Sequence, residues 1–204
     1  MQRNIVRFGA SVYRFFRTRR PLVFFTGLFL LGCVLGVGVF CRVEYAAALA
    51  EKMLPAPVTV SWEGILRAIG SSCFFGWLML LLLYLVGLSP CGVFVAVLVP
   101  FFYGMGVGIT ESALYAQGFS GVLFSAVFLV PHTVFCAAAL LLGSCETAHM
   151  SAVLGKQLFS SVGKVGETAR CFRFYSLRFL ILAALVLIAG ILNALVRMVY
   201  YPLG

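Results

Sequence analysis

Val86-Gly87-Leu88-Ser89-Pro90-Cys91-Gly92 interrupts a long apolar run that covers residues 71–110 of this 204-residue chain. Glycine, serine and proline together break a helix and permit a tight turn. A single helix over the whole run would be far too long for one crossing of a hydrocarbon core about 30 Å thick. The stretch therefore predicts two helices, 71–88 and 91–110, that are joined as a hairpin.

The composition explains why such helices need lipid around them. Hydrophobic residues make up 63% of the chain and charged residues 10%, whereas soluble domains carry about 25% charged residues. The chain has too few polar side chains to cover a soluble globule, so its apolar surface must face a lipid bilayer. The high glycine and aromatic content is typical of the same class.

Three further apolar runs flank the hairpin, at 21–41, 118–144 and 179–196. None of the five runs has an acidic or basic residue in its interior, and each approaches or exceeds the 20 or so residues that a membrane-spanning helix needs. The run 21–41 is longer than the apolar part of a signal peptide, which has about 7–15 residues. The sequence therefore predicts an all-α, polytopic transmembrane helix bundle of about five spans, with an uncleaved first helix.

The basic residues predict the orientation of this bundle. Six arginines precede the first run: Arg3, Arg7, Arg14, Arg17, Arg19 and Arg20. They indicate an N-terminus inside the cell and a contact with anionic lipid heads, not nucleic acid. The segment 145–178 carries a second basic cluster of Lys156, Lys164, Arg170, Arg173 and Arg178. Five spans place both clusters inside and the C-terminus outside, whereas an even number would separate them.

The expected organisation has one outer and one inner segment of appreciable length. Its parts are a basic N-terminal segment 1–20, a first helix 21–41, an outer segment 42–70, three helices in 71–144, a basic cytoplasmic loop 145–178, and a last helix with the outer C-terminus in 179–204. In the inner loop, 147–164 is amphipathic and predicts a helix on the membrane surface, either a linker or a docking site. Outside, Glu51, Trp62, Glu63 and Glu111 are candidate contacts for a partner; a plain connecting loop is the alternative.

No catalytic or cofactor-binding pattern is present. The chain contains no aspartate, no G-x-x-x-x-G-K-[ST] loop, no H-E-x-x-H motif and no C-x-x-C pair, so we expect no cofactor, no metal site and no enzymatic activity. An intramembrane enzyme would need a polar partner for His132. The candidates for that role are Ser125, Thr133 and Tyr103.

Prolines in the third and fourth runs are the most unusual feature of the predicted spans. Pro100 and Pro131 each remove an intrahelical hydrogen bond and predict a helix break. Transporters use paired broken helices to build a site at the membrane midplane. His132 is an ionisable residue at that depth, which marks a functional candidate. The structural alternative is a neutral His132 that bonds to a carbonyl freed by proline.

Small residues with a spacing of four occur in two of the runs. Gly104 and Gly108 form one G-x-x-x-G pair, with Gly106 between them, and Gly32 and Gly36 form another in the first run. Such pairs let helix backbones approach closely. We therefore assign these glycines to helix packing in preference to a substrate path.

Two adjacent motifs carry a family resemblance. They are the run Pro100-Phe101-Phe102-Tyr103-Gly104-Met105-Gly106-Val107-Gly108 and, past the short segment 117–121, Leu129-Val130-Pro131-His132. With the basic start, one helix, an outer segment and four more helices, they resemble the stage II sporulation protein M family of endospore-forming bacteria.

The resemblance implies a scaffold in the mother-cell membrane at the septum during engulfment. Members of that family recruit and position two peptidoglycan-degrading partners, stage II sporulation proteins D and P, and have no hydrolytic role themselves. The alternative function is a small permease component with a midplane site at the proline-broken helices.

Overall fold

The computed structural model describes residues 20–40, 62–159 and 165–200, and every element in these ranges is helical. The elements are α2 (Arg20–Phe40), α4 (Trp62–Gly87), α5 (Gly92–Tyr115), α6 (Phe119–Phe124), the π-helical turn η1 (Ser125–Leu129), α7 (Val130–Phe159) and α8 (Val165–Tyr200). Glu51 and the arginines before Arg20 lie outside the described residues.

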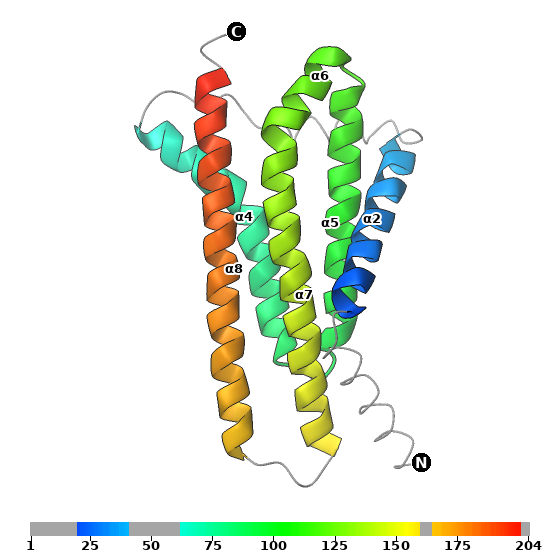
Figure 1. Ribbon diagram of the computed structural model, residues 1–204, viewed down its shortest axis with the longest axis vertical. Coiled ribbons are helices and arrows are strands. Elements are labelled where there is room, and N and C mark those ends of the chain that lie inside the picture. The colour runs from blue at the N-terminus through cyan, green and yellow to red at the C-terminus, as the bar shows by residue number, and fades with distance from the viewer. Residues whose placement is uncertain (1–19, 41–61, 160–164, 201–204) are drawn as a thin grey trace.

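Five of these helices are long and apolar enough to cross a membrane, which confirms the predicted polytopic bundle. The spans are Pro21–Val39, Trp62–Gly87, Gly92–Tyr115, Val130–Gln157 and Cys171–Leu195. The chain is thus a multi-pass membrane protein. Because five is an odd number, α2 begins at one end of the bundle and α8 finishes at the other (Figure 1). Which end lies inside the cell stays a prediction.

The turn between α4 and α5 is the hairpin that the glycine, serine and proline residues predict. Its backbone closes through hydrogen bonds from the Ser89 N–H to the Val86 carbonyl, 2.9 Å, and from the Gly92 N–H to the Ser89 carbonyl, 3.1 Å. We call the end of the bundle that holds this turn the basic end, since Lys156 and Arg173 are near it. The other end, where α2 finishes and α4 begins, is the opposite end.

Helix α7 is the centre of the bundle, because it contacts each of the other four spanning helices. Figure 1 shows α8, α7, α5 and α2 following one another across the view, with α4 behind α7 and α8. Helix α2 is the outermost and packs mainly on α5. The buried core is built largely of small and medium apolar side chains, among them Cys73, Leu80, Leu83, Ala96, Cys136, Ala139, Leu140 and Val186.

Side chains from α7 and α8 cap the end of α4 beside the hairpin turn. The last four carbonyls of a helix have no partner within the helix, and Tyr84 carries the first of these in α4. The Tyr175 hydroxyl lies 2.9 Å from the Tyr84 carbonyl and 3.2 Å from that of Leu83, and the Thr147 hydroxyl donates to Leu83 at 3.0 Å. These contacts attach the end of α4 to the two following helices.

The helices extend further than the apolar runs predict. Helix α7 continues past residue 144 to Phe159, and α8 begins at Val165, so the expected inner loop 145–178 is mostly helical. The expected surface helix 147–164 is instead, up to Phe159, the second half of α7. Its Thr147 and Ser151 are fully buried among the other helices. The prediction of a surface helix was wrong because short polar side chains can be buried between helices. A polar stripe on a helix therefore does not by itself indicate a surface that faces water. Likewise α4 includes 62–70 of the expected outer segment.

Candidate functional site

The four glycines of the two G-x-x-x-G pairs lie at one crossing of α2 and α5. A Cβ atom added to Gly32, Gly36, Gly104 or Gly108 would press directly against a backbone carbonyl oxygen of the other helix. Those oxygens belong to Phe101, Met105, Phe29 and Cys33, respectively. The two backbones are therefore in mutual contact over two helical turns, a geometry that allows Cα–H···O interactions between helices.

Gly106 and Pro100 have different surroundings on the same helix. A Cβ added to Gly106 would meet no atom within 4 Å, so this glycine does not take part in the crossing. Pro100 is fully buried, and α5 continues through it from Gly92 to Tyr115 without interruption. The proline removes one backbone hydrogen bond but does not divide the helix.

The irregularity near Pro131 is a π-helical turn that comes just before it. The Val130 N–H donates to the Ser125 carbonyl, five residues earlier in place of the usual four. Pro131, which has no N–H to donate, follows this turn directly, within helical backbone that continues from η1 into α7. Single π-helical turns of this kind are frequent at functional sites.

His132 is half-buried one residue further along α7. Its Nε2 atom lies 3.6 Å from the Cys136 sulfur, one helical turn ahead. Tyr103 packs against the core cluster that includes Cys136. Of the side chains considered as polar partners of His132, Ser125 donates its hydroxyl to a different residue, Glu111.

The Glu111–Ser125 contact joins the end of α5 to the π-helical turn. Ser125 is fully buried, and its hydroxyl donates to the Glu111 carboxylate. The residues beside Glu111 hydrogen-bond within their own helix, with Thr110 donating to the Gly106 carbonyl at 2.9 Å and Ser112 to that of Gly108 at 2.8 Å. The Glu111 carboxylate therefore accepts a hydrogen bond at the opposite end of the bundle.

Trp62 and Glu63, two of the candidate partner contacts, form the exposed first turn of α4. Trp62 is 73% exposed. Glu63 carries the negative charge that a helix N-terminus favours. Both lie at the opposite end of the bundle, as Glu111 does. Within the described ranges, no group of three His, Cys or Glu side chains could hold a metal ion.

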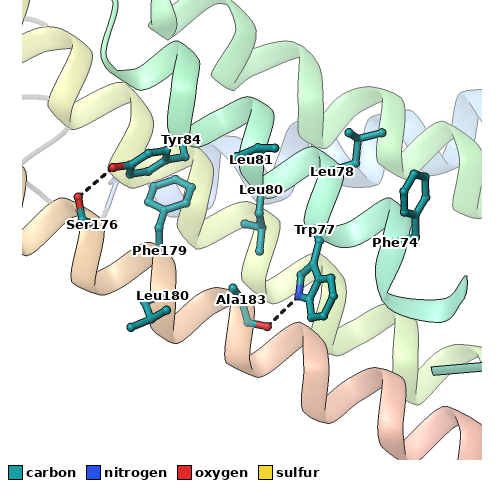
Figure 2. A pocket seen from close by; sticks show the side chains of 10 residues that line it. All are labelled: Phe74, Trp77, Leu78, Leu80, Leu81, Tyr84, Ser176, Phe179, Leu180 and Ala183. Carbon is teal, nitrogen blue, oxygen red and sulfur yellow. Dashed lines mark hydrogen bonds between the residues drawn. The ribbon is translucent and has the colours of Figure 1, made fainter. Parts of the chain in front are cut away.

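A groove between α4 and α8 is the feature that the sequence patterns did not indicate. It has a volume of about 580 Å³ and is lined almost entirely by apolar side chains (Figure 2). Two hydrogen bonds connect its walls. The Trp77 indole N–H donates to the Ala183 carbonyl at 3.0 Å, and the hydroxyls of Tyr84 and Ser176 lie 3.1 Å apart. Hydropathy alone cannot reveal such a groove, because its residues have the same apolar character as any lipid-facing surface.

Comparisons of the chain with protein-family models, with curated proteins and with solved structures find no match.

Proposed function

We propose that this protein is a non-enzymatic membrane scaffold that positions peptidoglycan-degrading partners at the septum during engulfment. The observation that carries the proposal is the backbone crossing of α2 on α5. Gly104 and Gly108, which belong to the motif that resembles stage II sporulation protein M, pack against α2. Under this proposal, the motif holds the bundle together, as a scaffold requires, and takes no part in a chemical reaction.

The geometry also supports docking of the partners at the opposite end of the bundle. Helix α2, which is attached to α5 by backbone contacts, finishes at the opposite end of the bundle, and α4 begins there with the exposed Trp62 and Glu63. A surface carried on packed helices loses less entropy when a partner binds. The exposed Trp62 is the kind of side chain that dominates protein interfaces.

Co-purification with the two membrane-anchored hydrolases, stage II sporulation proteins D and P, tests the proposal. A Trp62→Ala, Glu63→Gln double variant should weaken capture of the partners about thirtyfold if Trp62 contributes about 2 kcal/mol, as interface tryptophans do. Phe119→Ala is the matched control, because Phe119 is an aromatic residue 83% exposed at the same end of the bundle. Equal capture by the double variant and the parent would exclude this docking surface, and failure of the parent to capture either hydrolase would exclude the partners.

A transport component is the second candidate function, favoured by the π-helical turn beside Glu111. An acidic side chain next to an irregular helix is an arrangement found at ion and substrate sites in membranes. Solute uptake into liposomes, driven by a partner ATPase, tests this candidate. Uptake that is lost in Glu111→Gln and in His132→Gln would favour transport over the scaffold.

A further inference from the structure

The groove between α4 and α8 is open toward the surroundings of the bundle and closed on its inner side. Its floor is formed by Leu80 and Phe179, which are 3% and 6% exposed. Its rim is formed by strongly exposed apolar side chains such as Phe74, Leu81 and Leu180. The volume of about 580 Å³ falls within the range of about 300–1,000 Å³ that is typical of small-molecule sites.

The walls of the groove are held in place before any ligand arrives. Trp77 is fixed at one end by its bond to the Ala183 carbonyl. At the other end, Tyr84 stacks on Tyr175 with ring centroids 5.3 Å apart and meets Phe179 edge-on at 5.4 Å. Preformed walls are typical of a binding site, because the site then loses little entropy on binding.

The length and direction of the groove match one leaflet of a bilayer. It follows α4 from Phe74 to Tyr84, a distance of about 15 Å at 1.5 Å per residue. Half of a hydrocarbon core about 30 Å thick has the same length. Figure 2 shows the Tyr84–Ser176 pair at one end of the groove and Phe74 with Trp77 at the other. Because α4 finishes at Gly87, the Tyr84 end of the groove is the one near the basic end.

The positively charged Arg173 lies just beyond the Tyr84 end of the groove. Arg173, Ser176, Leu180 and Ala183 follow one another at the three- and four-residue spacing of a single helix face. Arg173 is exposed and has no acidic partner within the described part of the chain. Arg178 differs, since it forms an ion pair with Glu146 of α7. The face of α8 that lines the groove therefore continues, near the end of the span Cys171–Leu195, into a positive charge that has no ion pair among the described residues.

We propose that this groove binds an anionic phospholipid, with one acyl chain along Phe74–Tyr84 and the phosphate at Arg173. The apolar lining accepts the chain, and the guanidinium complements the phosphate, which it can bind with two parallel hydrogen bonds. The proposal does not use the arginines before α2 and does not depend on the scaffold function.

Quenching of Trp77 fluorescence tests the site directly. The chain has two tryptophans, so Trp62→Phe leaves Trp77, on the groove wall, as the single emitter. The purified protein is placed in phosphatidylcholine vesicles that contain increasing fractions of phosphatidylglycerol or phosphatidylcholine with brominated acyl chains. Brominated phosphatidylglycerol should reach half-maximal quenching at about a fivefold lower mole fraction, the contribution of one arginine near an anionic surface.

Two variants assign the preference to Arg173. Arg173→Gln should remove the fivefold difference between the lipids, whereas Arg67→Gln, the same change in charge near the opposite end of α4, should keep it. Identical quenching curves for the two lipids in the parent would overturn the proposal, as would a preference that survives Arg173→Gln. Absence of quenching by either lipid would also overturn it, because the groove would then be covered by a second copy or a partner helix.

Discussion

Replacing Gly104 by alanine should loosen the crossing of α2 and α5, while the same replacement two residues away at Gly106 should not. At Gly104 the new methyl group would press on the Phe29 carbonyl oxygen of α2, and the backbone cannot move aside as a flexible side chain could. At Gly106 the methyl group would have no atom within 4 Å. The two variants carry the same chemical change on one helix and differ in what the methyl group meets.

The expected magnitude follows from three contributions. Inserting a methyl group into a tight contact costs about 1–3 kcal/mol, and each lost Cα–H···O contact costs about 0.5–1 kcal/mol. Alanine favours a helix over glycine by about 1 kcal/mol, and this gain is common to both variants. The free energy of unfolding of Gly104→Ala should therefore lie about 1.5–4 kcal/mol below that of Gly106→Ala, whose own stability should equal or exceed that of the parent.

Unfolding in mixed micelles of increasing sodium dodecyl sulfate content, followed by circular dichroism, measures this difference. Alkylation of Cys33, mapped by mass spectrometry, gives a local readout, because the Cys33 backbone lies within the crossing. Cys33 should react faster in Gly104→Ala than in Gly106→Ala. Equal stability and equal Cys33 reactivity of the two variants would refute the backbone crossing.

Three further predictions concern other contacts and the topology. Tyr175→Phe removes the hydroxyl that caps α4 and should lower the free energy of unfolding by about 0.6–1.7 kcal/mol; Thr147→Val should cost less, because the carbonyl that Thr147 bonds keeps a second donor. Ser125→Ala leaves the Glu111 carboxylate without its donor and should cost about 1–3 kcal/mol. Glu111→Gln in the Ser125→Ala background should restore part of that loss, and an additive double variant would speak against the contact. A reporter fused after Gly204 should lie on the opposite face of the membrane from one fused at the N-terminus, and reporters on the same face would exclude an odd number of spans.

Much of the fold could be predicted, because hydropathy reports directly on exposure to lipid. Each of the five runs overlaps one of the five spans, although the fourth span, Val130–Gln157, begins 12 residues later than the run 118–144. The Gly87–Gly92 segment is the turn between α4 and α5. The packing role of the G-x-x-x-G pairs could be predicted for a similar reason. A spacing of four residues puts both glycines on one helix face, and the absence of side chains has few uses in an apolar helix other than close packing.

The remaining features depend on contacts between distant segments, which periodicity does not record. Ser151 and Thr147 resemble the polar side of a surface helix, yet both are fully buried in α7. Nothing in the order of residues 125–129 distinguishes a π-helical turn from an α-helical one; Pro131 indicates an irregularity without its type. The Glu111–Ser125 contact and the groove of α4 and α8 arise only once the helices are packed.

The α2–α5 crossing sets an order of events during synthesis. Helix α2 leaves the ribosome before α5, and this packing partner is not complete until Tyr115, 75 positions after Phe40. At about 5–20 residues per second, translation of that interval takes roughly 4–15 s. During this time the glycine face of α2 is in lipid or beside the insertion machinery, without its partner. We therefore expect a ribosome stalled between α2 and α5 to leave a membrane-inserted helix that quality-control proteases can recognise by its unpaired face.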